Sequence, residues 1–169
     1  MSTHAPVRVE RSDVTLRPAT LDDVREIAAI ERLSFSDPWS RQSFAQLVDG
    51  PAHFVVAERP FAGQRAVVGY VVAWVVVEQA EIANIAVAPS ARRLGVGALL
   101  LDDAIAALAT RGARAIFLEV RRSNESAQAL YASRGFREVG CRRGYYRNPV
   151  EDALILRRDI EPESPSRDM

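Results

Sequence analysis

A glycine-spaced arginine loop is the first candidate for binding chemistry. It consists of Arg92-Arg93-Leu94-Gly95-Val96-Gly97, between a predicted strand and a long predicted helix. The first amides of a helix lack intrahelical partners and lie at the positive end of its dipole, so they attract anions. Glycines let a phosphate approach the backbone, and arginines add charge-assisted hydrogen bonds. The spacing differs from a dinucleotide fingerprint, and no lysine follows as in a P-loop. Two interpretations of the loop therefore remain open: a phosphate site, and an ordinary helix start with two solvated arginines.

A carboxylate within an apolar strand is the second candidate. Strand alternation puts Glu119 on one face with Phe117 and Arg121, opposite Leu118. A carboxylate on a strand covered by helices is costly unless it is paired or faces a cleft. Taken singly, Glu119 is explained by pairing with an arginine, and Tyr131 by the core of the following helix.

The residue types exclude several chemistries. All 22 basic residues are arginine, which rules out Schiff-base chemistry and the Walker lysine. His4, His53 and Cys141 are too few for a structural zinc site, and we expect no metal. No serine lies in a Gly-x-Ser-x-Gly elbow. The single cysteine cannot form an internal disulfide, which favours a reducing cytoplasm, and we expect Cys141 to be a small core residue.

Length and composition predict one globular domain. The chain has 169 residues, of which 48% are hydrophobic and 26% charged. Basic and acidic residues number 22 each, and this balance argues against nucleic-acid or anionic-membrane binding. The longest apolar run, 67–77, is shorter than the roughly 20 residues needed to span a bilayer and indicates a buried strand. We expect a flexible N-terminus over 1–13, a single domain over 14–160 and a disordered tail over 161–169.

Hydrophobic periodicity and turn residues predict alternating elements. The expected strands are 14–17, 53–58, 66–77, 81–87, 115–120, 136–146 and 153–158. The expected helices start at Thr20, at Ser40 (through Val48), at Gly95 (through Arg111) and at Ser123 or Asn124 (to about Ser133). This order predicts an α/β fold with a mixed, mostly antiparallel sheet and helices on both faces. The strand-helix-strand unit around 81–120 should be parallel and right-handed.

Taken together, the motifs resemble the GCN5-related N-acetyltransferase (GNAT) superfamily, and within it the bacterial ribosomal-protein-alanine N-acetyltransferases. The resemblance covers about residues 14–158. The matching segments are Asp37-Pro38-Trp39-Ser40, Asn84-Ile85-Ala86-Val87, Arg92-x-x-Gly95-x-Gly97, Leu118-Glu119-Val120-Arg121, Ser123-Asn124, Leu130-Tyr131, Gly135-Phe136, Arg143-Gly144-Tyr145-Tyr146 and Glu151-Asp152-Ala153. The loop marks the superfamily, whereas the Glu119 strand with the double tyrosine narrows it. Leu94 stands where the family usually has a polar residue.

The resemblance implies acetyl-CoA as donor and the α-amine of a protein, most simply a ribosomal protein starting with alanine, as acceptor. It implies Glu119 as general base and Tyr131 as general acid. The implied cofactor-binding residues are Ile85, Ala86 and Val87 toward the pantetheine, Arg92, Arg93, Leu94, Gly95, Val96, Gly97 and Ala98 toward the pyrophosphate, and Asn124 at the start of its helix. The implied acceptor groove consists of Trp39, Tyr145 and Tyr146.

The implied chemistry suits these residue types. An α-ammonium has a pKa of roughly 7.7 to 8, so a weak base such as a carboxylate frees it. A tyrosine with a pKa of about 10 can protonate the departing thiolate, and no covalent intermediate is required. Two alternatives stay open: an acetyltransferase for lysine side chains or small amines, and a non-catalytic acyl-CoA-binding module. The acid-base pair argues against the second.

Overall fold

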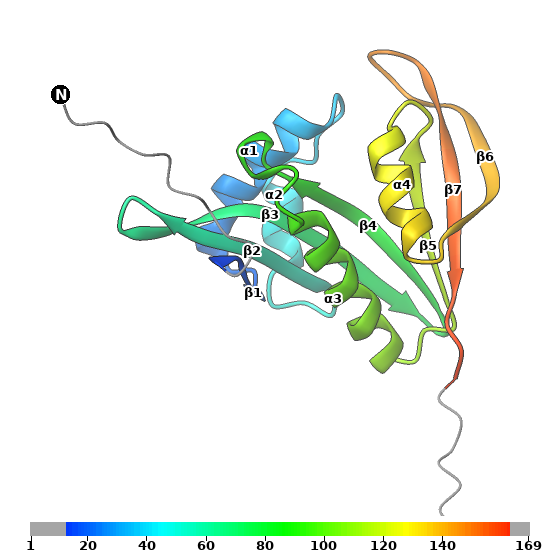
Figure 1. The fold of residues 1–169 in the computed structure, drawn as a ribbon, viewed down its shortest axis with the longest axis horizontal. Helices are drawn as coiled ribbons and strands as arrows, with labels where there is room; N and C mark the ends of the chain where they lie inside the picture. Colours follow the sequence, from blue (N-terminus) through cyan, green and yellow to red (C-terminus); the bar gives the residue numbers. More distant parts are fainter. Residues whose placement is uncertain (1–12, 163–169) are drawn as a thin grey trace, which may run out of the picture.

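One seven-stranded sheet organises the described part of the protein. The computed structural model describes residues 13–162, and the sheet has the order β1-β2-β3-β4-β5-β7-β6 (Figure 1). The strands are β1 (Thr15–Pro18), β2 (His53–Phe61), β3 (Gln64–Val76), β4 (Gln79–Val87), β5 (Ala115–Arg121), β6 (Arg137–Tyr146) and β7 (Glu151–Asp159). All neighbouring strands are antiparallel except β4 and β5, which are parallel. The predicted mixed, mostly antiparallel α/β sheet is therefore confirmed.

Helices cover both faces of the sheet (Figure 1). The helices are α1 (Val24–Ser34), α2 (Arg41–Leu47), α3 (Val96–Thr110) and α4 (Glu125–Ser133), with short 3-10 turns η2 (Leu21–Asp23) and η3 (Pro89–Ala91). Side chains cap the first turns of α2 and α4. The Ser40 hydroxyl accepts the amide of Ser43, and the Asn124 side chain accepts the amide of Ala127. No helix within residues 13–162 is both long and apolar enough to cross a membrane.

Strand alternation divides the core into two layers. Val71 and Ala73 of β3 pack with α3 in one layer, while Tyr70 and Val72 of the same strand pack with α1 and α2 in the other. All four strand residues are fully buried. The two layers place α3 and α4 on one face of the sheet and α1 and α2 on the other.

The parallel pair β4–β5 is joined over only a short length. Its pairing runs from Gln79 with Ala115 to Glu81 with Phe117 and then stops. The two strands meet near the lower right of Figure 1 and separate above that point. As a result, the carboxyl-terminal half of β4 has β3 on one side and no strand partner on the other. This split opens the middle of the sheet.

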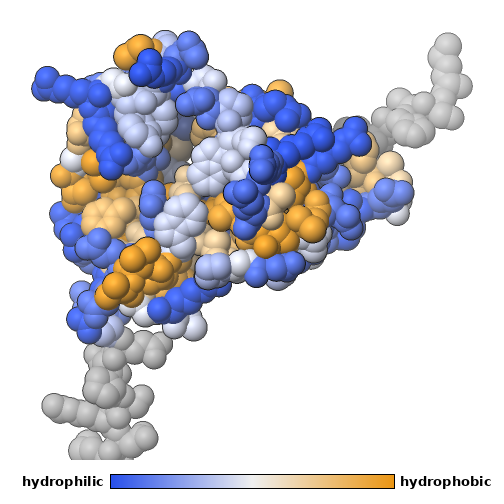
Figure 2. All heavy atoms as spheres, turned by 180° about the vertical axis from the view of Figure 1, so that it is seen from behind, coloured by the Kyte–Doolittle hydropathy of each residue, from blue (hydrophilic) through white to orange (hydrophobic). Residues whose placement is uncertain are grey.

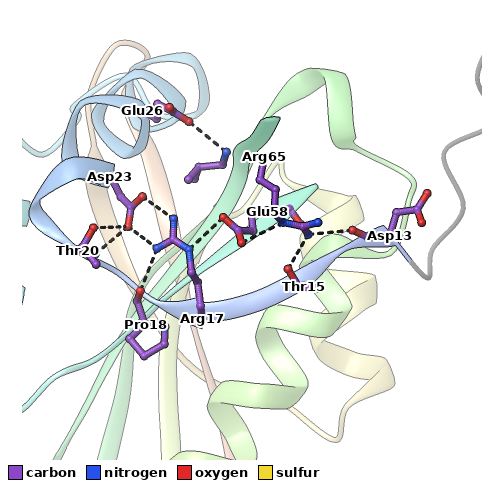
Figure 3. A network of polar contacts seen from close by, with 10 residues as sticks. Asp13, Thr15, Arg17, Pro18, Thr20, Asp23, Glu26, Glu58 and Arg65 are labelled. Atoms are coloured by element: carbon purple, nitrogen blue, oxygen red, sulfur yellow. Dashed lines mark hydrogen bonds and ion pairs between the residues drawn. The ribbon is translucent and has the colours of Figure 1, made fainter. Parts of the chain in front are cut away.

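A polar network fastens β1 to the edge of the sheet (Figure 3). The Arg17 guanidinium donates to both carboxylate oxygens of Asp23, at 2.7 and 2.8 Å, and to Glu58 at 3.0 Å. Burial alone would raise the pKa of Asp23. The hydrogen bonds from Arg17 and Thr20 outweigh burial and hold this pKa below its usual value. The network orients the start of α1 at a place far along the chain from the loop and the Glu119 strand.

Three sequence predictions need correction or fall outside the described residues. Cys141 is exposed rather than a small core residue, because β6 is the edge strand and is exposed along almost all of its length. Gly95 is the N-cap residue of α3, with its first helical residue at Val96. The segments expected to be flexible or disordered, 1–13 and 161–169, lie almost entirely outside the described residues.

Candidate active site

The loop before α3 presents a row of free backbone amides. The six amides from Arg93 to Ala98 make no hydrogen bond of normal geometry to another residue in 13–162, and the first helical bond is that of Leu99 to the Gly95 carbonyl. Six adjacent unpaired N–H groups at the positive end of a 15-residue helix form a strong anion site. The loop predicted to bind phosphate thus has backbone amides that are free to donate to an anion.

Individual side chains of the loop explain its sequence. Gly95 has a φ of 77°, a left-handed conformation in which a side chain is strained. Leu94 is half-buried and packs against the α3 core layer, which accounts for an apolar residue at this position. Arg92 donates to the carbonyl of Val87 at the end of β4, so the loop and this strand are directly connected.

The free side of β4 adjoins this loop. Ile85, Ala86 and Val87 lie beyond the last β4–β5 pair, so on that side their backbone faces no strand. Backbone N–H and C=O groups in such a position are able to bind an extended amide-containing chain. The predicted pantetheine residues therefore stand at an unpaired strand edge that leads from the amide loop into the split.

Glu119 lines a cavity on the face of the sheet opposite α3. The cavity has a volume of about 300 Å³, and Trp74, Glu81, Phe117 and Arg142 also contribute to its wall. Figure 2 views the molecule from behind and shows apolar residues among charged ones on the surface of this side. The Glu119 side chain is 22% exposed and forms an ion pair with Arg142 of β6. The pairing with an arginine that was expected for a single glutamate is therefore present, and the paired carboxylate also faces the cavity.

The double tyrosine of β6 is electrostatically linked to this carboxylate. Burial and the nearby Glu119 carboxylate both raise the pKa of Tyr145, and the same causes raise the pKa of Tyr146 to about 12. The two rings pack edge to face with centroids 5.1 Å apart. Two of the predicted acceptor-groove residues are therefore brought to the predicted base.

Tyr131 occupies the other side of the split, on α4. Its ring is buried and packs edge to face on Phe136. Its hydroxyl makes no hydrogen bond within residues 13–162. Because no fully buried side-chain nitrogen or oxygen in this range lacks a partner, the hydroxyl oxygen is not completely enclosed. Burial and the neighbouring Tyr146 raise the pKa of Tyr131, which keeps this phenol protonated at neutral pH.

A buried carboxylate that sequence reasoning missed orders the third acceptor-groove residue. Glu31 is 1% exposed, and one of its oxygens accepts the backbone amide of Trp39 at 3.0 Å. It also accepts hydrogen bonds from the Asn84 amide group and the Tyr70 hydroxyl. Glu31 thereby joins the loop that carries Trp39 to β4. Its spacing of four residues from the buried Ile27 would have revealed that it lies on the core face of α1.

Two further residues predicted to bind the cofactor are Asn124 and Arg93. Asn124 is the N-cap of α4, and its side-chain oxygen also accepts from Ser126. Arg93 has a φ of 66°, and its side chain is exposed. Among residues 13–162, no group of three or more His, Cys, Asp or Glu side chains is arranged to hold a metal ion.

Known proteins share this arrangement over most of the chain. The model of the acetyltransferase (GNAT) family matches residues 21–136. The [ribosomal protein bS18]-alanine N-acetyltransferase of Escherichia coli (strain K12) is 37% identical over 129 residues, 75% of this chain and 84% of that protein. The crystal structure of the Escherichia coli ribosomal-protein-S18-alanine N-acetyltransferase superposes with a TM-score of 0.78 at 32% identity, covering 90% of this chain and 97% of that one.

A more distant structure shares the fold. The crystal structure of Arabidopsis thaliana NAA60 in complex with acetyl-CoA has a TM-score of 0.79 at 20% identity, over 87% of this chain and 98% of that one. The family match spans well over half of the sequence. The chain therefore belongs to the GNAT family and is an N-acetyltransferase.

Proposed function

We propose that the protein transfers the acetyl group of acetyl-CoA directly to the α-amine of a protein N-terminus. We further propose that the acceptor is a ribosomal protein of the small subunit whose first residue is alanine. The observation that carries the proposal is the position of Glu119, in a cavity on the sheet face opposite the helix whose N-terminus presents free amides. Donor and acceptor would approach the split between β4 and β5 from opposite faces.

The donor fits the residues on the α3 side. The amides of Arg93–Ala98 would hold the pyrophosphate of acetyl-CoA, and the free edge of Ile85–Val87 would pair with the pantetheine amides. Asn124 stands at the start of α4, where it would contact the cofactor. When bound, acetyl-CoA supplies an activated acetyl group on a thiol leaving group.

Glu119 and Tyr131 would perform the two proton transfers. The Glu119 carboxylate would accept a proton from the acceptor ammonium, directly or through one water, since an α-ammonium with a pKa of roughly 7.7 to 8 needs only a weak base. Tyr131 would donate its proton to the departing thiolate. Its raised pKa keeps the donor proton in place before the reaction, and its accessible hydroxyl allows the transfer.

We propose direct transfer in a ternary complex rather than through an acetylated enzyme. The only thiol, Cys141, lies on the exposed edge strand β6. The Arg122 guanidinium donates a hydrogen bond to its sulfur at 3.5 Å. Neither Glu119 nor Tyr131 is a hydrogen-bond partner of this thiol, so Cys141 is not paired with either of the proposed proton-transfer residues.

The acceptor is supported by the relatives whose names state their substrate. The Escherichia coli relative named as an alanine N-acetyltransferase of ribosomal protein bS18 covers three quarters of this chain. An acceptor groove containing Trp39, Tyr145 and Tyr146 would hold the first residues of such a chain in an extended form. A lysine side chain or a small amine is the competing acceptor.

A pair of peptides tests the proposal. The first begins with a free alanine and contains no lysine, and the second has the same sequence with a blocked N-terminus and one lysine added. Thiol release from acetyl-CoA and the intact mass of the product are measured for both. We expect a 42 Da gain, the mass of one acetyl group on an amine, on the first peptide only. Acetylation of the blocked peptide alone would assign a lysine acetyltransferase, and acetylation of neither would overturn the proposal.

A further inference from the structure

Arg121 makes contacts that the proposed chemistry does not use. It follows Glu119 by two residues on β5, so both side chains project from the same face of the sheet. One of its terminal nitrogens donates to the Pro149 carbonyl and to the Glu151 carboxylate, each at 3.1 Å. The other donates to the Ser36 hydroxyl at 2.8 Å and to the Arg147 carbonyl at 3.4 Å. One guanidinium thus contacts two segments that are distant from it in sequence, the loop of Ser36 and residues 147–151.

Both segments include loops on the acceptor side. The α1–α2 loop, residues 35–40, carries Trp39, and the β6–β7 turn, residues 147–150, directly follows Tyr146. The Ser36 hydroxyl also donates to the Arg147 carbonyl at 2.7 Å, so the two loops touch at this point. Within residues 13–162, Ser36 is the member of the α1–α2 loop whose side chain contacts Arg121.

The remaining contacts fix the guanidinium itself. It lies over the Tyr146 ring, 4.4 Å from the ring centroid, and forms an ion pair with Glu151. The side chains of Arg121 and Glu151 are only 23% and 17% exposed, so this pair is shielded from solvent more than an ordinary surface pair. The planar guanidinium has several donors in a fixed fork, and a lysine ammonium at the end of a flexible stem cannot reproduce this geometry.

We propose that Arg121 is a positioning residue. Its hydrogen bonds hold the α1–α2 loop against the β6–β7 turn and so set the width of the acceptor groove. This inference rests on the proposed function, because it assumes that these loops border the acceptor. A groove whose two loops are already held together binds an extended peptide at a lower cost in conformational entropy than two independent loops would. Arg121 therefore acts on acceptor binding, while the amide loop and its bound acetyl-CoA stay unaffected.

The test compares Arg121→Lys with Arg17→Lys. Arg17 is a matched control because it also bridges separate segments through two carboxylates, at the β1 edge of the sheet. Both variants should lower the melting temperature. Arg121→Lys alone should raise the KM for the alanine peptide by about tenfold, which corresponds to about 1.4 kcal/mol. Its kcat and its Kd for acetyl-CoA should stay near the wild-type values.

A double-mutant cycle with Ser36→Ala tests the contact between Arg121 and the α1–α2 loop. Ser36→Ala should raise the acceptor KM in the wild-type background and have little further effect in Arg121→Lys, because the shared contact is already lost. Independent of activity, hydrogen exchange in residues 35–40 and 147–150 should accelerate together in Arg121→Lys and stay unchanged in Arg17→Lys.

The outcomes separate the inference from the function on which it rests. If the wild type is active and Arg121→Lys has the same acceptor KM and the same loop exchange, the positioning role of Arg121 is overturned and the proposed function stays intact. Additive effects of Arg121→Lys and Ser36→Ala would overturn that role as well. A wild type that acetylates no α-amine would overturn the proposed function and the acceptor role of Arg121 with it.

Discussion

Glu119 on β5 forms an ion pair with Arg142 on β6, with 3.2 Å between the Glu119 Oε1 and the Arg142 Nε. The two side chains are 22% and 57% exposed, respectively, and both line the cavity. A pair this open to solvent contributes little stability, so it can separate easily. The guanidinium occupies the position at which an acceptor ammonium would approach the proposed base.

The first prediction concerns this competition. Replacing Arg142 with Gln removes the internal cation from Glu119, so the acceptor ammonium no longer has to displace it. We expect the KM for the alanine peptide to fall by roughly two- to fivefold, the size expected of a weak exposed pair. Steady-state kinetics with varied peptide at saturating acetyl-CoA measures this change. A rise in KM would instead show that Arg142 orients Glu119 for the acceptor.

The second prediction tests the amide loop. Gly95→Val places a branched side chain among the free amides, and we expect it to abolish most of the thermal stabilisation that acetyl-CoA gives the wild type. The substitution also strains the backbone, so a control is needed. Gly63 has the same φ of 77° and has no atom within 4 Å of an added Cβ. Gly63→Val should lower the melting temperature and still show the full acetyl-CoA shift. Equal shifts in both variants would count against the phosphate site.

The sequence predicted the elements well because their signals are local. Apolar periodicity predicted α3, the capping residues Ser40 and Asn124 predicted the starts of α2 and α4, and the valine-rich run predicted β3. The exposure of Cys141 could not be predicted in this way, because alternation along β6 does not reveal that this strand lies at an edge with neither face well covered. The split of β4 from β5 depends on long-range packing, and the sequence did not predict it.

The candidate site was predicted where motifs mark it and missed where tertiary contacts create it. The amide loop and Glu119 carry patterns that point to chemistry without any structure. Glu31 and Arg121 looked like ordinary charged residues of a helix and a strand. Their roles arise from partners more than 35 and 80 positions away, such as Tyr70 and Ser36.

The third prediction concerns acid stability at the β1 edge. The pKa of Asp23 is lowered in the folded protein, so its contribution to stability is present above its unfolded pKa of about 3.9 and is lost as the pH falls through the folded value. Asp23→Asn should lower the free energy of unfolding at pH 7 by about 1 to 3 kcal/mol. The melting-temperature gap between wild type and variant should narrow between pH 4 and pH 2. A gap that is constant with pH would show that the loss comes from packing.

The fourth prediction tests Tyr131 as the acid. Tyr131→Phe keeps the ring packed on Phe136 and removes only the hydroxyl. Because that hydroxyl has no hydrogen-bond partner within the described residues, its removal should change the melting temperature little. The kcat should fall by roughly 10² to 10⁴, the usual worth of a general acid, and the Kd for acetyl-CoA should stay near wild type. An unchanged kcat would remove Tyr131 from the mechanism.

The last prediction concerns Glu119 as the base. Glu119→Gln preserves the shape of the side chain and removes its ability to accept the proton, so kcat should fall by roughly 10² to 10⁴ at pH 7. The acceptor amine loses its proton without help as the pH rises past roughly 8, so the deficit of the variant should shrink between pH 7 and pH 9. A structural role for Glu119 makes a different prediction, namely a lower melting temperature and a deficit that does not change with pH. Arg142→Gln breaks the same ion pair and is the matched control for that role. We would record the rates of the wild type and both variants across the pH series, together with their melting curves, to separate proton transfer from a structural role. A Glu119→Gln enzyme with wild-type turnover at pH 7 would end the assignment of this carboxylate as the base.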